Sequence, residues 1–130
     1  MVYLIGIALA LGTVATFRQF PRRELQLYAT GLVVAAWIYV AFAALGGAGG
    51  RWIGIELGGV VFYSLFAFWG VRRGWAVGLA LGWAIHVAWD VLLHGPETPF
   101  VPWWYPPICL AYDFVMAAYI AWRFRDGASP

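Results

Sequence analysis

The sequence predicts an all-α, polytopic membrane protein, a bundle of five transmembrane helices with the N-terminus outside and the C-terminus in the cytoplasm. Three observations predict this fold class: an apolar composition, five apolar stretches of helical length, and arginines that gather on one side. Of the 130 residues, 64% are apolar and 11% are charged, whereas a soluble domain has about half apolar and about a quarter charged residues. A soluble globular domain is therefore excluded.

Each of the five apolar stretches is long enough for a membrane span or close to it. A helix needs about 20 mainly apolar residues to cross a bilayer core of about 30 Å, because it rises about 1.5 Å per residue. The stretches lie at residues 2–17, 25–45, 52–71, 75–93 and 104–122. Together they are expected to form a single integral membrane domain over residues 1–130.

The segments between these stretches are short and carry residues that interrupt helices. Residues 18–24 contain Pro21, residues 46–51 are mainly glycine, and residues 72–73 are two arginines. Residues 95–107 are rich in proline and aromatic side chains, which favours an extended connector at the outer membrane interface. Each segment is therefore expected to be a turn or a loop.

The arginines set the expected orientation. Seven of them fall on one side of a five-span bundle, and only Arg51 falls on the other; the seven are Arg18, Arg22, Arg23, Arg72, Arg73, Arg123 and Arg125. Cytoplasmic loops retain Lys and Arg, so this side is expected to face the cytoplasm of a prokaryotic inner or plasma membrane. With no lysine and a net charge of +2, the chain lacks the basic surface of a nucleic-acid-binding protein.

Five ionisable residues fall inside the apolar stretches. His86, Asp90 and His94 stand four residues apart in the fourth stretch, Glu56 lies in the third, and Asp113 lies in the fifth. A spacing of four places side chains on one face of a helix. Each such residue costs about 2.5 to 3.5 kcal/mol to insert and usually marks a pathway or a site.

These five residues are expected to share one depth in the membrane. Counted from the outer ends of the stretches, Glu56 and Asp90 lie about 6 Å deep, and His86 and Asp113 lie about 12 to 14 Å deep. The sequence therefore predicts a common polar pocket that opens outward. Gly54 and Gly58 flank Glu56, a spacing that lets helices approach closely, so close helix packing is expected at both glycines.

Acid/base chemistry on a hydrophobic substrate is the leading interpretation. Mixed sites of histidines and acids can exchange protons near neutral pH, and the expected catalytic residues are His86, Asp90, Glu56 and Asp113. Aromatic rings attract cations, and six such residues are expected to bind an isoprenoid or sterol-like substrate: Trp83, Trp89, Trp103, Trp104, Tyr105 and Tyr112. An isomerase or cyclase of this type requires no cofactor, and a membrane lipid or isoprenoid would be its partner.

A metal site is the second interpretation. Zn²⁺ or Fe²⁺ would be held by a subset of His86, Asp90, His94, Glu56 and Asp113, giving an intramembrane lipid hydrolase or oxidase. Residues 86, 90 and 94 spread over about 12 Å of helix, so all three cannot bind one ion. Cys109, the single cysteine, could join the ligands but is more typical of a small apolar filler.

Two further alternatives use the same residues. One is a non-enzymatic transporter or binding subunit, acting alone or as a homo-oligomer, although no ionisable row continues through the cytoplasmic half. The other is a structural role, for example a pair of Asp90 with His86 that keeps the helices in register. The accumulated insertion cost of five residues makes a purely structural role for all of them the weaker explanation.

Two segments carry a resemblance to a known family. One is Gly82-Trp83-Ala84-Ile85-His86-Val87-Ala88-Trp89-Asp90 through His94, and the other is Val101-Pro102-Trp103-Trp104-Tyr105-Pro106 through Cys109 and Asp113. They resemble a family of small prokaryotic integral membrane proteins that is classed as a domain of unknown function. The likeness covers nearly the whole chain and implies the five-span topology and the site. In residue types and span count, the chain is also similar to membrane sterol isomerases.

Overall fold

The computed structural model describes residues 1–95 and 97–126, which form five α-helices and one short 3-10 turn. The helices are α1 (Val2–Phe17), α2 (Glu24–Leu45), α3 (Gly50–Arg72), α4 (Ala76–Leu93) and α5 (Tyr105–Arg123), and the turn is η1 (Pro21–Arg23). The expected all-α fold is therefore confirmed, with each helix boundary within two residues of its expected place.

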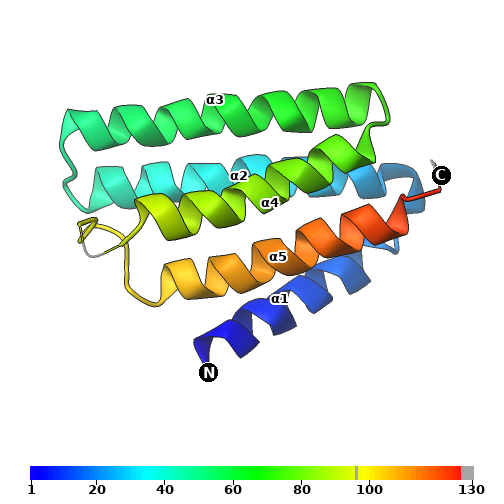
Figure 1. Cartoon of the computed structure of the whole chain (residues 1–130), viewed down its shortest axis with the longest axis horizontal. Coiled ribbons are helices and arrows are strands. Elements are labelled where there is room, and N and C mark those ends of the chain that lie inside the picture. Colours follow the sequence, from blue (N-terminus) through cyan, green and yellow to red (C-terminus); the bar gives the residue numbers. More distant parts are fainter. Residues whose placement is uncertain (96, 127–130) are drawn as a thin grey trace.

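Helices α2 to α5 form an antiparallel bundle, and α1 packs on α5, parallel to it, instead of on α2, its neighbour in sequence (Figure 1). Helices α2 to α5 run alternately up and down, and α1 lies along α5 (Figure 1). The main helix contacts are α2 with α3, α3 with α4, α4 with α5, and α1 with α5. The N-terminus, the α2–α3 turn and the α4–α5 loop lie at one end of the bundle, which we call the loop end.

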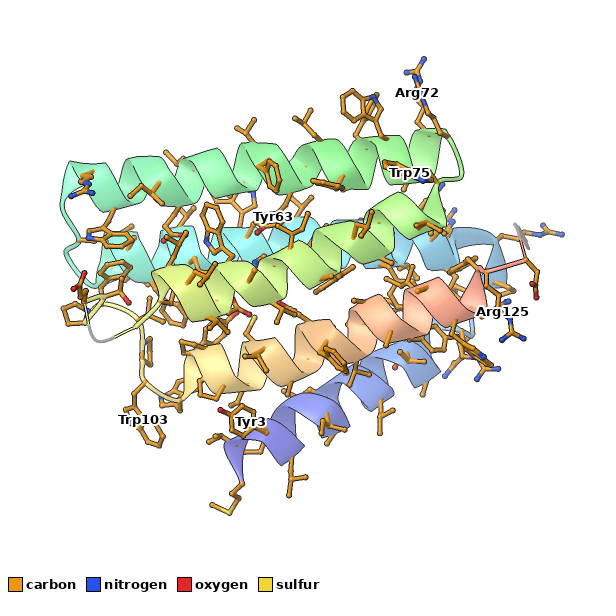
Figure 2. All side chains as sticks on the ribbon, in the orientation of Figure 1. Tyr3, Tyr63, Arg72, Trp75, Trp103 and Arg125 are labelled. Atoms are coloured by element: carbon orange, nitrogen blue, oxygen red, sulfur yellow. The ribbon has the colours of Figure 1, made fainter. Side chains whose placement is uncertain are left out.

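Three of the helical segments are both long and apolar enough to cross a membrane: Pro21–Leu45, Gly50–Arg72 and Ala76–Leu93. Helix α1 is apolar but has only 16 residues. Helix α5 has 19 residues, and its two prolines, three tyrosines and Asp113 make it less apolar. Arg72 and Arg125 lie at the end opposite Trp103 and Tyr3 (Figure 2).

Two glycines give the sharp turns that end α2 and α3. Gly47 and Gly74 have φ angles of 70° and 60°, a conformation that favours glycine because it has no Cβ. The amide of Ala48 donates to the carbonyl of Ala43 at 2.8 Å, and the amide of Trp75 donates to the carbonyl of Gly70 at 2.8 Å. Both are six-to-one helix-ending hydrogen bonds, so α3 and α4 turn back at once.

Close packing beside Glu56 occurs at a different glycine from those expected. A Cβ at Gly54 or Gly58 would meet no described atom within 4 Å, so the expectation for this pair is wrong. A Cβ at Gly59 would instead lie 2.8 Å from Cζ2 of Trp89. The rotation of α3 therefore points the glycine pair away from the bundle and brings Gly59 against α4.

Candidate active site

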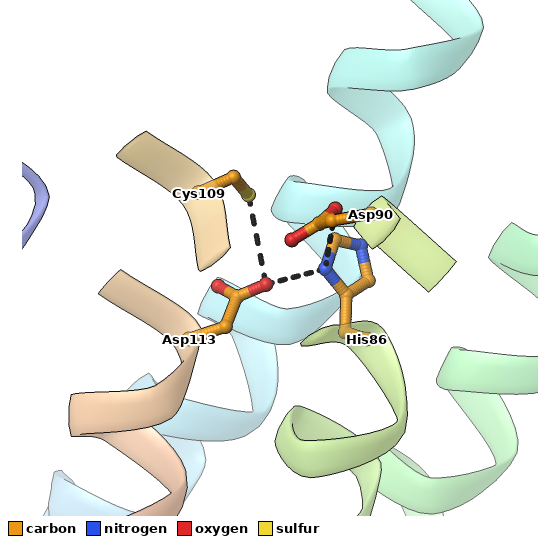
Figure 3. A group of neighbouring side chains, drawn as sticks. All are labelled: His86, Asp90, Cys109 and Asp113. Carbon is orange, nitrogen blue, oxygen red and sulfur yellow. Dashed lines mark hydrogen bonds and ion pairs between the residues drawn. The ribbon is translucent and has the colours of Figure 1, made fainter. Parts of the chain in front are cut away.

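Four buried side chains from α4 and α5 meet between the two helices. His86 and Asp90 come from α4, and Cys109 and Asp113 come from α5 (Figure 3). Each helix contributes residues four apart, which lie on one face, and these two faces pack together. One nitrogen, oxygen or sulfur atom from each residue lies within 4.8 Å of the others. We call these four residues the His–Asp cluster.

The imidazole of His86 lies between the two carboxylates. Its Nδ1 is 2.5 Å from Oδ2 of Asp113 and 3.6 Å from Oδ1 of Asp90. The thiol of Cys109 donates to the same Asp113 oxygen at 3.5 Å. His86 and Asp113 are 0% exposed and Asp90 is 1% exposed, so bulk water does not compete for their hydrogen bonds. The arrangement can hold a proton between His86 and Asp113.

Tyr39 of α2 completes the surroundings of Asp90. Its hydroxyl donates to Oδ1 of Asp90 at 2.6 Å, and its ring stacks on that of His94 with centroids 3.8 Å apart. The sequence did not single out Tyr39, because a tyrosine inside an apolar helix usually signals core packing. The position of Tyr39 in the sequence of α2 does not reveal that its hydroxyl contacts Asp90 of α4.

Glu56 and His94 form a second group beside the cluster. Nε2 of His94 lies 2.9 Å from Oε1 of Glu56, and the indole N–H of Trp89 donates to Oε2 of Glu56 at 3.3 Å. The five ionisable residues therefore separate into a trio, His86, Asp90 and Asp113, and this pair. Tyr39 connects them, since it stacks on His94 and donates to Asp90.

Several buried polar atoms in the two groups, and the hydroxyl of Tyr63 beside His86, have no hydrogen-bond partner in the described part of the chain. They are His86 Nε2, Asp90 Oδ2, Asp113 Oδ1, His94 Nδ1 and the Tyr63 hydroxyl. An unsatisfied buried polar atom costs about 1 to 3 kcal/mol, and such atoms are unusual in a native fold. These atoms are available to a ligand, to water or to a reacting molecule.

Two cavities reach the His–Asp cluster from different directions. The loop-end cavity has a volume of about 630 Å³, and its lining includes Asp90, His94 and residues of the α4–α5 loop. The side cavity, of about 250 Å³, lies between α1, α2 and α5, and its lining includes Cys109 and Asp113. Each carboxylate of the cluster therefore belongs to the lining of a cavity, although both side chains are buried.

The six aromatic residues expected to bind substrate lie in different places. Tyr105 and Tyr112 line the side cavity, and Trp103 lines the loop-end cavity while being 79% exposed. Trp89 is held by Glu56. Trp83 is buried, and Trp104 is 43% exposed with its ring centroid 6.0 Å from that of Tyr105.

The residues grouped closely enough to hold a metal ion are those of the His–Asp cluster. The group contains His86, Asp90 and Asp113 from the expected ligand set, and adds Cys109. His94 and Glu56, also expected as ligands, lie outside the group and pair with each other. A set of one nitrogen, two carboxylates and one sulfur suits Zn²⁺ better than Ca²⁺ or Mg²⁺.

A buried carboxylate that the sequence analysis missed lies at the other end of the bundle. Oε1 of Glu24 accepts hydrogen bonds from Tyr28 at 3.4 Å and from Tyr119 at 3.1 Å, and Oε2 lies 3.5 Å from Nη2 of Arg123. Glu24 was assigned to a polar connection, whereas it is the first residue of α2 and is 1% exposed. It joins the start of α2 to the end of α5.

Comparison with known proteins gives one match. No curated protein and no solved structure matches the chain. The model of a family of unknown function, DUF6010, matches residues 1–129. This match confirms the resemblance to a family classed as a domain of unknown function, and it carries no activity. The chain belongs to the DUF6010 family.

Proposed function

We propose that this protein is an intramembrane enzyme that transfers protons to and from a lipid-soluble substrate of the isoprenoid or sterol type, as an isomerase or cyclase. The observation that carries the proposal is the buried contact of 2.5 Å between His86 Nδ1 and Asp113 Oδ2. General acid/base catalysis requires a positioned side chain that can give and take a proton, and it contributes about 10²- to 10⁴-fold to a rate. A buried imidazole in contact with a carboxylate provides such a pair.

Insertion into a membrane is part of the proposal. Large apolar side chains are widely exposed on the bundle, among them Leu4, Leu9, Val61, Leu92 and Phe114 at 54% to 79%. Contiguous exposed apolar surface is uncommon on a soluble monomer, and three helical segments have the length and composition of spans. The arginine distribution favours an outer N-terminus and a cytoplasmic C-terminus in a cell membrane.

The proposed reaction begins with proton transfer to a carbon–carbon double bond. The π electrons of the double bond form a new C–H bond with the proton of Asp113, leaving a cation on the adjacent carbon. The carboxylate left on Asp113 then accepts a proton from a neighbouring carbon, and the electrons of that C–H bond form the shifted double bond. No atom is gained or lost overall, so the product is an isomer.

Deuterium incorporation tests this proposal. The purified protein in lipid nanodiscs is incubated in D₂O with farnesol, and mass spectrometry measures deuterium bound to carbon. We expect incorporation by the wild type and a loss of about 10²-fold or more in Asp113→Asn and His86→Gln. Asp126→Asn is the matched control, because the Asp126 side chain is 80% exposed. Equal incorporation in Asp113→Asn and Asp126→Asn would exclude Asp113 as the acid.

Metal-dependent lipid chemistry is the second candidate, favoured by the four potential ligands within 4.8 Å of one another. Two ligands of a tetrahedral Zn²⁺ lie about 3.4 Å apart when each metal bond is about 2.1 Å. The His86–Asp113 contact of 2.5 Å is shorter and has the length of a hydrogen bond, which is why proton transfer is preferred.

Metal analysis of the purified protein separates the two candidates. Under the proton-transfer proposal, Cys109→Ala retains deuterium incorporation and the wild type carries no stoichiometric metal. Under the metal proposal, near-stoichiometric zinc or iron accompanies the wild type and is lost in His86→Ala and Asp90→Ala. Absence of both metal and deuterium incorporation would favour the transporter or binding-subunit alternative.

A further inference from the structure

The two carboxylates of the His–Asp cluster face different cavities. Asp90 lines the loop-end cavity together with His94, whereas Asp113 lines the side cavity together with Cys109. Between them lies a single nitrogen, Nδ1 of His86, at 3.6 Å from Asp90 and 2.5 Å from Asp113. The cluster therefore stands between two separate spaces.

The side cavity has the lining expected for a hydrocarbon chain. Apolar residues of three helices surround it, namely Leu9, Gly31, Val34, Ala35, Ile38 and Ile108. Of its polar members, Tyr112 donates its hydroxyl to Thr13 at 3.1 Å, and the Cys109 thiol donates to Asp113. The Tyr105 hydroxyl lies 3.9 Å from the Cys109 sulfur, and Oδ1 of Asp113 is buried and has no partner among the described residues.

The rim of the side cavity lies on the outer surface of the bundle. Val34 and Leu9 at this rim are 51% and 54% exposed. Helix α1 packs mainly on α5 and makes few contacts with α2, so the cavity lies where α1 and α2 diverge. In a bilayer, this rim would face the acyl chains, which gives an apolar molecule a direct route into the side cavity.

The loop-end cavity differs in position and lining. It lies under the α4–α5 loop, at the end of the bundle, and its lining includes Gly95, Thr98, Pro99 and Trp103. Most of its lining residues are apolar, but Asp90, His94 and Thr98 give water in this space polar partners, whereas the side cavity has a carboxylate, a thiol and two tyrosines in its lining. Figure 3 shows that one oxygen of Asp113 points away from His86 and Asp90, and Asp113 lines the side cavity but not the loop-end cavity.

We infer that the side cavity binds the unsaturated hydrocarbon chain of an isoprenoid lipid, and that the loop-end cavity supplies protons from water through Asp90 and His86 to Asp113. This inference rests on the proposed function, and it assigns the residue that contacts the substrate and the residue that exchanges protons with water. Asp113 is the residue that touches the substrate, and Asp90 is a relay. Because each turnover returns a proton to Asp113, no net proton is taken up: between turnovers a proton from water moves through Asp90 and Nδ1 of His86 to Asp113, and the proton that Asp113 held leaves by the same route.

Photolabelling locates the hydrocarbon chain without depending on turnover. The probe is a long-chain alkyl alcohol with a diazirine in its chain, and peptide mass spectrometry finds the labelled positions. Three exposed valines allow the same change in three places: Val34→Trp fills the side cavity, Val91→Trp fills the loop-end cavity, and Val61→Trp on α3 lines neither.

We expect labels on α2 and α5 near Val34 and Ile108, a loss of about 10-fold or more in Val34→Trp, and no loss in the other two variants. Labelling of residues 97–104 that Val91→Trp abolishes would overturn the assignment of the chain. Unchanged labelling in Val34→Trp would overturn it as well. The control Val61→Trp reports whether an added indole on the surface alone disturbs the bundle.

Chemical rescue tests the order of the proton relay. Asp90→Gly is expected to slow deuterium incorporation into farnesol, and added formate, which fits the vacated space in the loop-end cavity, is expected to restore it. Asp113→Gly is expected to show no such rescue while retaining its photolabel. Rescue of Asp113→Gly but not of Asp90→Gly would reverse the two roles.

Photolabelling and deuterium incorporation test the inference and the proposed function separately. Photolabelling at the expected positions without deuterium incorporation would contradict the proposed function and leave the assignment of the side cavity standing. Deuterium incorporation with labels confined to the loop-end cavity would support the proposed function and overturn the inference.

Discussion

The rings of Tyr39 and His94 stack with their planes 7° apart, although Tyr39 lies in the C-terminal half of α2 and His94 follows the end of α4. The same tyrosine donates its hydroxyl to Asp90 at 2.6 Å. One side chain of α2 therefore fixes two polar residues of α4, by its ring face and by its hydroxyl. These two contacts can be separated by mutation.

Tyr39→Phe is expected to keep the stacking on His94 and to remove the hydrogen bond to Asp90. Because the carboxylate then loses a buried donor, we expect the free energy of unfolding to fall by about 1 to 3 kcal/mol. Thermal unfolding in detergent, followed by tryptophan fluorescence, measures the loss. Tyr3→Phe is the control, because Tyr3 is 52% exposed; equal stability of the two variants would contradict the role given to Tyr39.

The Glu56–His94 pair is expected to stabilise the bundle without taking part in proton transfer to the substrate. Glu56→Gln and His94→Gln each disturb a buried contact of 2.9 Å, and residues in direct contact show coupling of about 0.5 to 3 kcal/mol. A double-mutant cycle measured by thermal unfolding tests the coupling. The deuterium assay provides the second readout, since Glu56→Gln is expected to retain most incorporation.

A loss of about 10²-fold in Glu56→Gln, comparable with the loss expected for Asp113→Asn, would contradict this division. Glu56 would then belong with the catalytic residues, as the sequence alone suggested. An additive double-mutant cycle would likewise contradict the stabilising contact.

The five helices could be predicted because the length of an apolar stretch and the polar or proline-rich residues that end it are local properties. His86, Asp90 and Asp113 could be predicted as neighbours because ionisable residues in apolar helices avoid an apolar environment and turn inward. The spacing of four residues between His86 and Asp90 predicted that both lie on one face of their helix. These parts of the site depend on information carried within each helix.

The rest depends on how the helices are rotated against one another. Glu56 pairs with His94 and not with His86 because α3 approaches α4 through Gly59, and the pair Gly54 and Gly58 faces outward. Tyr39 could not be singled out, and Cys109 could be named only as an additional metal ligand, because both residue types are ordinary in apolar cores. The sequence pattern of a single helix does not determine how that helix is rotated in the bundle or which helix it packs against.

The packing of α1 on α5 is expected to depend on Gly6. A Cβ at this position would overlap the backbone carbonyl of Ile108, whereas a Cβ at Gly12 of the same helix would meet no described atom within 4 Å. Gly6→Ala is therefore expected to push α1 away from α5 and to destabilise the fold by about 1 to 3 kcal/mol. Gly12→Ala is expected to stabilise it by up to about 1 kcal/mol, because alanine favours helix.

Thermal unfolding of these two alanine variants measures both signs in one experiment. Since α1 also contributes Leu9 to the side cavity, Gly6→Ala is further expected to weaken photolabelling at that cavity, and Gly12→Ala is not. Equal stability of Gly6→Ala and Gly12→Ala would contradict the close approach of α1 and α5.

Glu24 is expected to contribute to stability and not to the chemistry at the opposite end of the bundle. Glu24→Gln keeps the size of the side chain but removes the charge that faces Arg123 at 3.5 Å, and it replaces an oxygen acceptor near two tyrosine hydroxyls. Removing one member of a buried pair leaves the other uncompensated. The Arg123 side chain is 31% exposed, so solvent screens part of the effect. We therefore expect a loss of about 1 to 2 kcal/mol, measured by thermal unfolding.

The control for this substitution is Glu97→Gln, which makes the same chemical change on an exposed residue of the α4–α5 loop. Deuterium incorporation per folded molecule is expected to stay unchanged in both variants, because Glu24 lies at the end of the bundle remote from the His–Asp cluster. A variant Glu24→Gln that unfolds like the wild type but loses incorporation would place this carboxylate on a proton path through the bundle. That result would favour transport over isomerisation, because an isomerisation takes back from the substrate the proton that it gives and needs no path between the two membrane faces.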